Sequence, residues 1–366
     1  MTYNITCMPG DGVGPEIVNE SIKVMKMVQQ IVTGFDLNFQ HYEAGAGHYL
    51  KTKTAFPDAA HDACKNGHAI FIGAMGIPEV RDQYGVEIQA WVGITLRKEL
   101  NLFAGVRPVK LFRGIKPVLN GIDCIDLIVL REQSEGLFAS FGGGFEVYNK
   151  VMGDTLVITR EGSTNITEYA FKLAQKRKGR APGAPTKVTC VDKSNIFRSY
   201  AFFRNIFFEV AKNYPDIECE SVYMDAMSLY CVQRPNTFDV IVTENQFGDI
   251  LSDLCSGVAG GMGIAPAGEF GHDYGMFQSA HGSAPTLAGR NIVNPVAQIL
   301  SAAMMLDWLG DKYNCAELGR ASEMIDKAVQ DAIADGHTTE DLGGRCSTSA
   351  FGDKIVEYLK KQSDLS

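Results

Sequence analysis

Short apolar runs alternate with longer stretches of helical periodicity along this chain. Continuous runs of Val, Ile and Leu are typical of buried strands, whereas apolar residues that recur every three or four positions are typical of amphipathic helices. The alternation predicts an α/β architecture with a largely parallel sheet. The predicted strands are residues 3–8, 37–42, 69–72, 126–130, 187–191 and 239–242. The predicted helices are residues 16–30, 196–212, 248–257, 295–308, 316–334 and 349–361.

Length, charge and cysteine spacing narrow the class of protein. The 366 residues exceed what one hydrophobic core usually supports, so two domains are expected. A net charge of −9 provides no basic field for nucleic acid or an anionic membrane. The one basic run, residues 172–180, is interpreted as a solvated helix end. The nine cysteines lack CxxC spacing and are expected to be buried free thiols, which favours a cytoplasmic location.

The segment PGDGVGPEI, residues 9–17, joins a predicted strand to a predicted helix. Its glycines allow tight turning, and a helix N-terminus favours anions. The spacing of Gly10, Gly12 and Gly14 is not the GxGxxG of a dinucleotide fingerprint. From the residues alone, a structural turn and a ligand loop are equally good interpretations.

Three arginines stand in apolar surroundings: Arg97 in ITLRKEL, Arg107 in FAGVRPV and Arg131 in LIVLREQ. A guanidinium group rarely follows an apolar strand unless an anion pairs with it. Arginine holds carboxylates in a bidentate fork, so three converging arginines would suit a substrate with two or three carboxylates. The alternative for each is a structural ion pair.

Carboxylates and a lysine form a second group of candidates. Asp249 and Asp253 are four residues apart, so both project from one helix face, where a hard cation would relieve their repulsion. The alternative is a pair of solvated side chains. Asp225 in YMDAM would be a further oxygen ligand, and Lys193 follows a predicted strand and could act as a base.

The segment SAHGSAPTLAGRNIVNP, residues 279–295, is rich in Gly, Ser, Ala and Pro. Such a loop can turn its backbone N–H groups toward phosphates or a base, and an ordinary long loop is the alternative.

Together, these segments resemble the isocitrate and isopropylmalate dehydrogenase family of β-decarboxylating dehydrogenases. The likeness runs in the same order from residues 9–17 to residues 341–351. It implies a two-domain α/β fold that is not a Rossmann fold, with a mostly parallel sheet in the large domain and an active site in the cleft. The large, cofactor-binding domain would comprise residues 1–102 and 258–366. The small domain would comprise residues 103–257, with a dimer-forming arm near residues 142–162.

The resemblance also implies a role for each candidate. Arg97, Arg107 and Arg131 would hold the substrate carboxylates. Mg²⁺ or Mn²⁺ would be bound by Asp249 and Asp253 together with Asp225 of the partner subunit. Lys193, also contributed across a homodimer or a multiple of dimers, would take the hydroxyl proton with help from Asp225. The implied cofactor-binding residues are Val13, His281, Gly282, Ser283, Ala284, Pro285, Thr286 and Asn294.

The chain departs from the family pattern at three places. Phe138 stands where the family has a tyrosine that helps protonate the enol, and a phenyl ring has no proton to give. Trp91 and Gly93 replace the serine and asparagine of isocitrate enzymes. Thr286 follows HGSAP where NADP enzymes have a lysine, which favours NAD and leaves NADP as the alternative.

The sequence therefore predicts metal-dependent, NAD-linked oxidation, with decarboxylation, of a malate-type 2-hydroxy acid. An isopropylmalate-like or alkylmalate-like substrate is favoured over isocitrate, tartrate or D-malate. A non-catalytic regulatory subunit that binds ligand is the alternative of another class, and Phe138 is the feature that supports it.

Overall fold

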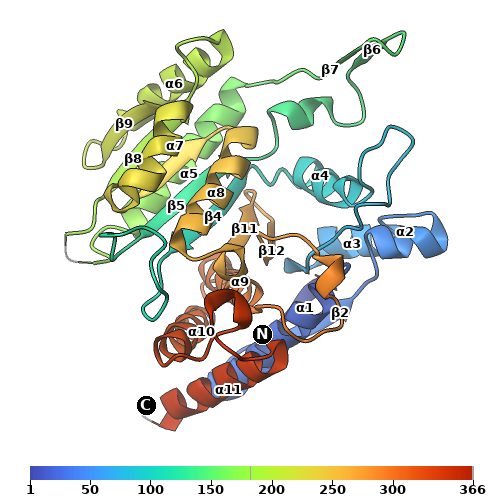
Figure 1. The fold of residues 1–366 in the computed structure, drawn as a ribbon, viewed down its shortest axis with the longest axis vertical. Coiled ribbons are helices and arrows are strands. Elements are labelled where there is room, and N and C mark those ends of the chain that lie inside the picture. The colour runs from blue at the N-terminus through green and yellow to red at the C-terminus, as the bar shows by residue number, and fades with distance from the viewer. Residues whose placement is uncertain (182, 365–366) are drawn as a thin grey trace.

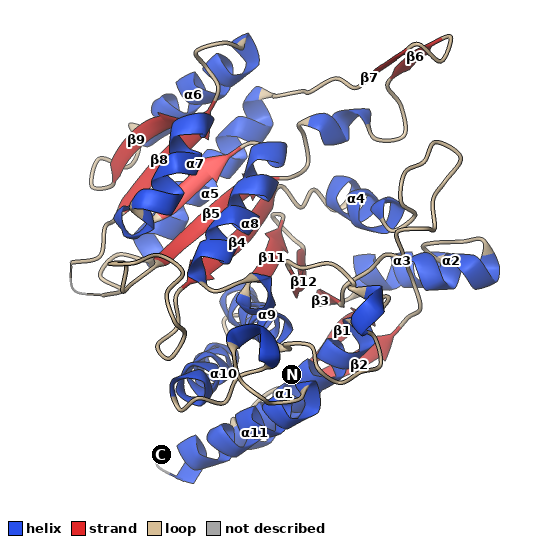
Figure 2. Ribbon diagram, in the orientation of Figure 1, coloured by secondary structure: helices blue, strands red, loops and turns tan. Residues whose placement is uncertain are grey.

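A computed structural model describes residues 1–181 and 183–364, and one ten-stranded sheet runs through it (Figures 1 and 2). In spatial order the strands are β2 (Asp36–His41), β1 (Thr2–Met8), β3 (Ala69–Ile72), β12 (Gly275–Ser279), β11 (Pro266–Phe270), β4 (Ala104–Lys110), β5 (Asp126–Glu132), β10 (Val240–Thr243), β8 (Lys187–Asp192) and β9 (Glu218–Tyr223). Both ends of the sheet are parallel, and the centre is antiparallel where β11 pairs with β12 and β4, and β4 pairs with β5. The α/β, mostly parallel architecture expected from the sequence is confirmed.

Helices cover the sheet in two groups that lie at opposite ends of the molecule (Figure 2). The first group contains α1 (Gly14–Ile31), α2 (Ala46–Thr52), α3 (Asp58–Asn66), α4 (Ala90–Glu99), α9 (Val296–Tyr313), α10 (Ala316–Ala334) and α11 (Thr348–Asp364). The second contains α5 (Arg160–Lys176), α6 (Arg198–Ala211), α7 (Met224–Gln233) and α8 (Asn245–Ala259). Segments from both ends of the chain build the first group, so the chain leaves this part of the molecule and returns to it.

The hydrophobic core explains why these segments fold as they do. Helix α9 is apolar on nearly all sides, and it is buried between β11, β12, α1 and α10. Amphipathic helices such as α1 and α10 bury one stripe and expose the other, as their period of 3.6 residues predicts. A second cluster packs α7 and α8 against the other face of β5 and β10. Sheet faces on both sides are therefore covered, as parallel strands require.

Strands β6 (Phe145–Val147) and β7 (Val151–Gly153) form a separate hairpin that projects from the body (Figure 1). Its tip residue Tyr148 is 90% exposed, and Phe145 and Met152 are also exposed. The hairpin lies within the arm that the family resemblance implies near residues 142–162, and its second strand ends at Gly153. Exposed aromatic side chains on a thin hairpin need a covering surface.

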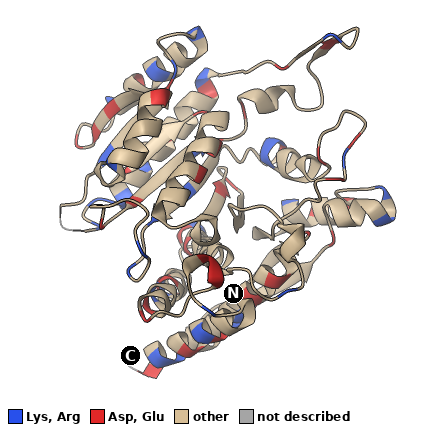
Figure 3. Ribbon diagram, in the orientation of Figure 1, with Lys and Arg blue, Asp and Glu red and all other residues tan. Residues whose placement is uncertain are grey.

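The basic run at the end of α5 is not merely solvated, so that expectation was wrong. Arg177 bonds to the buried Asp239 at 2.8 Å and to Asp126 at 2.8 Å, and Arg180 also pairs with Asp126. These ion pairs tie the helix end to the edges of β5 and β10. Acidic and basic residues are otherwise interspersed along the ribbon (Figure 3).

All nine cysteines are free, as expected, but only five are buried: Cys7, Cys64, Cys190, Cys231 and Cys255. Cys124 is exposed because it lies in the loop before β5. Among the described residues, no helix combines the length and the apolar character that crossing a membrane requires.

Candidate active site

The three arginines predicted from the sequence converge where β4, β5 and α4 meet. Arg131 lies near the end of β5, Arg107 lies on the neighbouring strand β4, and Arg97 lies in the last turn of α4. Arg107 and Arg131 are only 6% and 4% exposed. Three guanidinium groups this close would repel one another, so anionic partners must hold them.

The N-terminus of α8 supplies the partners of Arg131. Asn245 Oδ1 accepts hydrogen bonds from Arg131 Nε at 2.9 Å and Nη2 at 2.7 Å, and Asp249 forms an ion pair with Nη1. The Glu244 carboxylate caps the helix by accepting from the backbone N–H of Phe247 at 2.9 Å. Gly248 permits the close approach, because a Cβ there would lie 2.7 Å from Arg131 Cβ. Burial lowers the pKa of Arg131 to about 10, so it stays charged at neutral pH.

Arg97 has a partner that the sequence analysis missed. Glu269 on β11 is fully buried and accepts a bidentate pair from Arg97, at 2.9 Å to Nε and 2.7 Å to Nη2. Gln278 Nε2 donates to the same carboxylate at 2.6 Å. Burial acts to raise the pKa of Glu269, but Arg97 and then Arg107 and Arg131 outweigh it, and the pKa lies below its ordinary value. Glu269 therefore offsets one of the three positive charges.

Of the three arginines, Arg107 has the fewest hydrogen-bond and ion-pair partners for its guanidinium group. Its Nη2 lies 3.8 Å from Glu269 Oε1, and within the described structure its buried Nε has no hydrogen-bond partner. Burial lowers its pKa. A buried guanidinium N–H without an acceptor costs free energy, which a bound carboxylate would recover.

Phe138 lies beside the arginines, in the short helix η1 (Leu137–Ser140) that follows β5. The guanidinium carbons of Arg97 and Arg131 are 5.8 Å and 5.6 Å from the centre of its ring. Cations are attracted to the face of an aromatic ring, so the phenyl group stabilises the cluster.

Asp249 and Asp253 project from the same part of α8, as predicted. Burial raises the pKa of Asp253, and the neighbouring charge of Asp249 raises it further. Two carboxylates that repel in this way fit a divalent cation. Within residues 1–181 and 183–364, no three His, Cys, Asp or Glu side chains are grouped to hold a metal ion.

Lys193 and Asp225 form a pair at the far end of the sheet. Lys193 follows β8 and Asp225 begins α7, which follows the parallel neighbour β9. Lys193 Nζ lies 2.7 Å from Asp225 Oδ1, and this hydrogen bond lowers the pKa of the exposed Asp225. The structure thus brings the two together but not into contact with the arginines.

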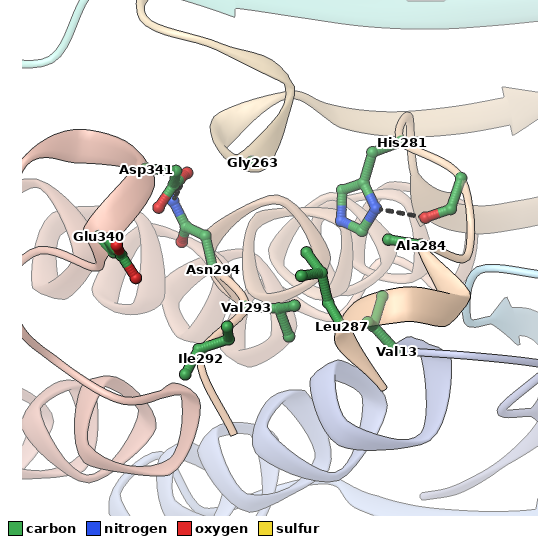
Figure 4. Close-up of a pocket in the computed structure, with 11 residues that line it drawn as sticks. Val13, Gly263, His281, Ala284, Leu287, Ile292, Val293, Asn294, Glu340 and Asp341 are labelled. Atoms are coloured by element: carbon green, nitrogen blue, oxygen red, sulfur yellow. Dashed lines mark hydrogen bonds between the residues drawn. The ribbon is translucent and has the colours of Figure 1, made fainter. Parts of the chain in front are cut away.

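The cofactor loop predicted from the sequence lines a cavity of about 510 Å³ (Figure 4). Val13, His281, Gly282, Ala284 and Asn294 line it, whereas the other predicted residues, Ser283, Pro285 and Thr286, lie in the same loop but outside the lining. The 9–17 turn is bonded to this loop, because Val13 N–H donates to Ser283 O at 2.8 Å. A Cβ on Gly12 would lie 2.1 Å from the same oxygen, which explains the glycine.

Two acidic residues in this cavity, Glu340 and Asp341, were not singled out from the sequence. Asp341 Oδ2 accepts from Asn294 Nδ2 at 3.0 Å, and the two side chains point toward each other in Figure 4. No lysine or arginine lines the cavity within the described structure. Carboxylates suit ribose hydroxyl groups and repel a 2′-phosphate.

An arginine cluster beside paired aspartates suits a substrate that carries carboxylates. The model of the isocitrate/isopropylmalate dehydrogenase family matches residues 4–355, and the chain belongs to this family. It is an enzyme, a β-decarboxylating dehydrogenase of 2-hydroxy acids.

Similar proteins span the whole chain. The 3-isopropylmalate/3-methylmalate dehydrogenase of Methanocaldococcus jannaschii is 36% identical over 98% of this chain and 100% of that protein. The 3-isopropylmalate dehydrogenase of Archaeoglobus fulgidus is 37% identical over 97% and 99%. Among solved structures, isocitrate dehydrogenase from Methylococcus capsulatus has a TM-score of 0.85 at 36% identity, covering 98% of this chain and 99% of that one. A beta-decarboxylating dehydrogenase from Thermococcus kodakarensis has a TM-score of 0.78 at 32% identity, covering 99% and 98%.

Proposed function

We propose that the protein uses NAD and Mg²⁺ or Mn²⁺ to oxidise a 3-substituted malate, with loss of CO₂. The convergence of Arg97, Arg107 and Arg131 carries this proposal, above all the unpartnered Nε of Arg107. Because guanidinium groups bind carboxylates in a planar fork, the cluster would hold the two carboxylates of malate. Both sequence relatives are named as 3-isopropylmalate enzymes, which supports a substrate built on a malate backbone.

Charge balance supports a dicarboxylate over a tricarboxylate such as isocitrate. Glu269 already occupies Nε and Nη2 of Arg97, and Asp249 occupies Nη1 of Arg131. A third substrate carboxylate would have to share Arg97 with the buried Glu269, and two carboxylates on one guanidinium group would repel each other.

The metal site would be completed across a dimer. Asp249 and Asp253 would contribute oxygen ligands, and Asp225 of the partner subunit would contribute the third. Exposed apolar side chains lie close to these residues along the chain: Ile196 and Phe197 follow Lys193, Leu229 and Val232 share α7 with Asp225, and Ile250 follows Asp249. Exposed apolar side chains that gather on a surface mark protein interfaces. The hairpin β6–β7 would act as the dimer-forming arm of a small domain spanning residues 103–257, with residues 1–102 and 258–366 forming the large domain.

Each group of side chains would have a distinct task in the reaction. The arginines would hold both carboxylates and fix the hydroxyl-bearing carbon. Lys193 of the partner subunit, held by Asp225, would accept the hydroxyl proton. When bound, the metal would polarise the hydroxyl oxygen and the cofactor would accept the hydride. Phe138 has no proton to donate, so the proton that replaces CO₂ would come from water or from Lys193.

The acidic lining of the cofactor cavity favours NAD. Asp341 and Glu340 would face the adenosine ribose, where a 2′-phosphate would be repelled. Arg290 lies in the same loop but does not line the cavity.

The first experiment measures NADH, NADPH and CO₂ with purified protein and Mg²⁺ or Mn²⁺. Malate, 3-methylmalate, 3-isopropylmalate, isocitrate and tartrate form the panel. We expect NADH from a 3-substituted malate, with one CO₂ per NADH. If no substrate of the panel is oxidised but ligand binding is retained, the protein is a regulatory subunit and the proposal is wrong.

A matched pair of variants tests the arginine cluster. Arg107→Met should lower kcat/KM for the preferred substrate about ten- to a hundredfold, since a hydrogen bond to a charged group contributes about 1.5–3 kcal/mol. Arg113→Met changes an exposed arginine six residues away and should leave kcat/KM unchanged. Equal losses in both variants would remove Arg107 from the binding site.

A further inference from the structure

A second cavity is lined by Phe138, whose ring also contacts Arg97 and Arg131. It has a volume of about 610 Å³ and lies between α4 and the segment that runs from η1 into the projecting hairpin. Five of its lining residues are aromatic: Tyr84, Trp91, Phe138, Phe141 and Phe145. Ligand pockets are commonly lined by such side chains.

Two features connect the cavity with the arginine cluster: the side chain of Phe138 and one face of helix α4. Phe138 lines the cavity, and its ring also contacts Arg97 and Arg131. On α4, Trp91, Ile94 and Arg97 recur every third residue, so one stripe of the helix runs from the cavity to the cluster. A substrate gripped by the arginines would therefore direct its next carbon substituent along this stripe.

The walls of the cavity are held in place by contacts of their own. The rings of Trp91 and Phe141 pack with their centres 4.7 Å apart, and Trp91 Nε1 donates to Asp82 at 3.1 Å. The polar end of the indole is thus satisfied at the rim, which leaves its ring faces for apolar contact.

The charges around the cavity exclude an acidic occupant. Its charged lining residues are Asp82, Glu146 and Asp154, and no lysine or arginine lines it in the part of the chain that the structure describes. Lys98 lies outside the lining, with its Nζ 5.9 Å from the centre of the Phe141 ring, and Arg97 is already paired with Glu269. A carboxylate-bearing substituent such as that of isocitrate would be repelled here.

We propose that this cavity binds the substituent at carbon 3 of the malate, and that this substituent is neutral and bulkier than isopropyl, such as an arylalkyl group. The inference rests on the proposed function, because the arginines must hold a malate backbone. Size supports it, since a closed cavity of about 150 Å³ already accommodates benzene. The aromatic rings would contribute edge-to-face and stacked contacts to an aryl group.

A series of malates tests the size and charge of the substituent. Malate and its 3-methyl, 3-isopropyl and 3-benzyl derivatives, with isocitrate, are assayed for NADH production and for binding by calorimetry with Mg²⁺. We expect kcat/KM to rise by about tenfold or more from 3-isopropylmalate to 3-benzylmalate, as one to two added apolar groups allow. Preference for isopropyl, methyl or isocitrate would overturn the inference while leaving the dehydrogenase function intact.

Two variants on α4 test whether the preference for a bulky substituent depends on this cavity. Ala90→Phe fills this cavity, whereas Thr95→Phe fills the neighbouring cavity on the other side of Trp91 and serves as the matched control. Ala90→Phe should lower kcat/KM for 3-benzylmalate about tenfold or more, and lower it much less for 3-methylmalate, whose small substituent needs little of the cavity. Equal losses for both substrates, or the same selectivity in Thr95→Phe, would contradict the proposal.

Calorimetry separates the two failures. If no malate is oxidised but 3-benzylmalate binds more tightly than 3-methylmalate, the cavity is supported and the dehydrogenase function fails. If the wild-type protein binds no member of the series, both proposals fail.

Discussion

The arginine cluster and the Lys193–Asp225 pair differ in how complete each is within one chain. The arginines are buried, and Glu269, Asn245 and Asp249 of the same chain hold them. Lys193 and Asp225 are bonded to each other, and the Asp225 side chain is 69% exposed. Buried charges must find partners within the fold, whereas an exposed pair can await a second surface. We infer that one chain builds the carboxylate-binding half and supplies the proton-transfer half to its neighbour.

The largest effect should come from removing the proton acceptor. Lys193→Met should lower kcat about 10²–10⁴-fold, the usual contribution of a general base. Asp249→Asn should also abolish metal-dependent turnover, since it removes a proposed ligand, without unfolding the protein. Each variant alone should be nearly inactive with a native circular dichroism spectrum. Retained turnover of Asp249→Asn with unchanged metal affinity would remove it from the metal site.

Mixing these two inactive variants distinguishes a shared site from a site within one chain. If each site combines Asp249 of one subunit with Lys193 of the other, a heterodimer has one intact site of two. Random exchange at equal amounts should then restore about a quarter of the wild-type activity. The control mixes each variant with itself after the same dissociation and refolding. No recovery after exchange, with heterodimers verified by mass, would place both residues in one chain's site.

Within the buried cluster, Arg97 and Arg107 should differ in what they stabilise. Arg97→Met leaves the fully buried Glu269 without its ion pair, so the free energy of unfolding should fall by about 3–5 kcal/mol. Urea unfolding measures this change. The double variant Arg97→Met with Glu269→Gln should recover much of the loss, because no unpaired charge remains. A small loss in the single variant would mean that Glu269 takes up a proton instead.

The family resemblance implies a tyrosine at the position of Phe138. Phe138→Tyr places a hydroxyl group near the proposed enol, which forms once CO₂ has left, so kcat should rise by about tenfold or more relative to wild type where protonation limits turnover. Stopped-flow detection of NADH and CO₂, compared with kcat in the steady state, separates oxidation and decarboxylation from the later protonation. Phe202→Tyr on α6 adds the same atom elsewhere and should change neither rate. An unchanged rate in Phe138→Tyr would show that protonation does not limit the reaction.

The same comparison shows what could be predicted from the sequence. The arginines and aspartates were found because charged residues next to apolar runs are unusual, and strand ends in an α/β sheet meet at one edge. Glu269 was missed because it lies 172 positions from Arg97, in a segment whose pattern shows only a short buried strand. Asp341 was missed for a similar reason, since it meets Asn294 from a distant loop. Periodicity predicts which face is buried, but not which distant side chain lies against it.

The ion pairs of Arg177 and Arg180 teach the same lesson for the fold. A run of basic residues at a helix end resembles a solvated surface, and only the position of Asp239 behind it changes that interpretation. Strand β9 and the central strands β11 and β12 were also absent from the sequence prediction. Strand β9 is mixed in polarity and pairs in parallel with β8 at the edge of the sheet. Strands β11 and β12 are short, and the antiparallel pairing at the centre of the sheet determines their conformation.

The last effect concerns stability alone and comes from Glu132, the buried residue that follows Arg131 at the end of β5. Burial raises its pKa to about 7, so the folded protein binds a proton there more tightly than the unfolded chain does. Its stabilising contribution is therefore complete below about pH 4.5 and is lost as the pH rises through 7, a change of about 3 kcal/mol. Glu132→Gln should flatten the pH dependence of the unfolding free energy between pH 5 and 8. The exposed Glu323→Gln should not. An unchanged slope in Glu132→Gln would show that its hydrogen bonds from Ser134 and Glu135 keep the carboxylate ionised despite its burial.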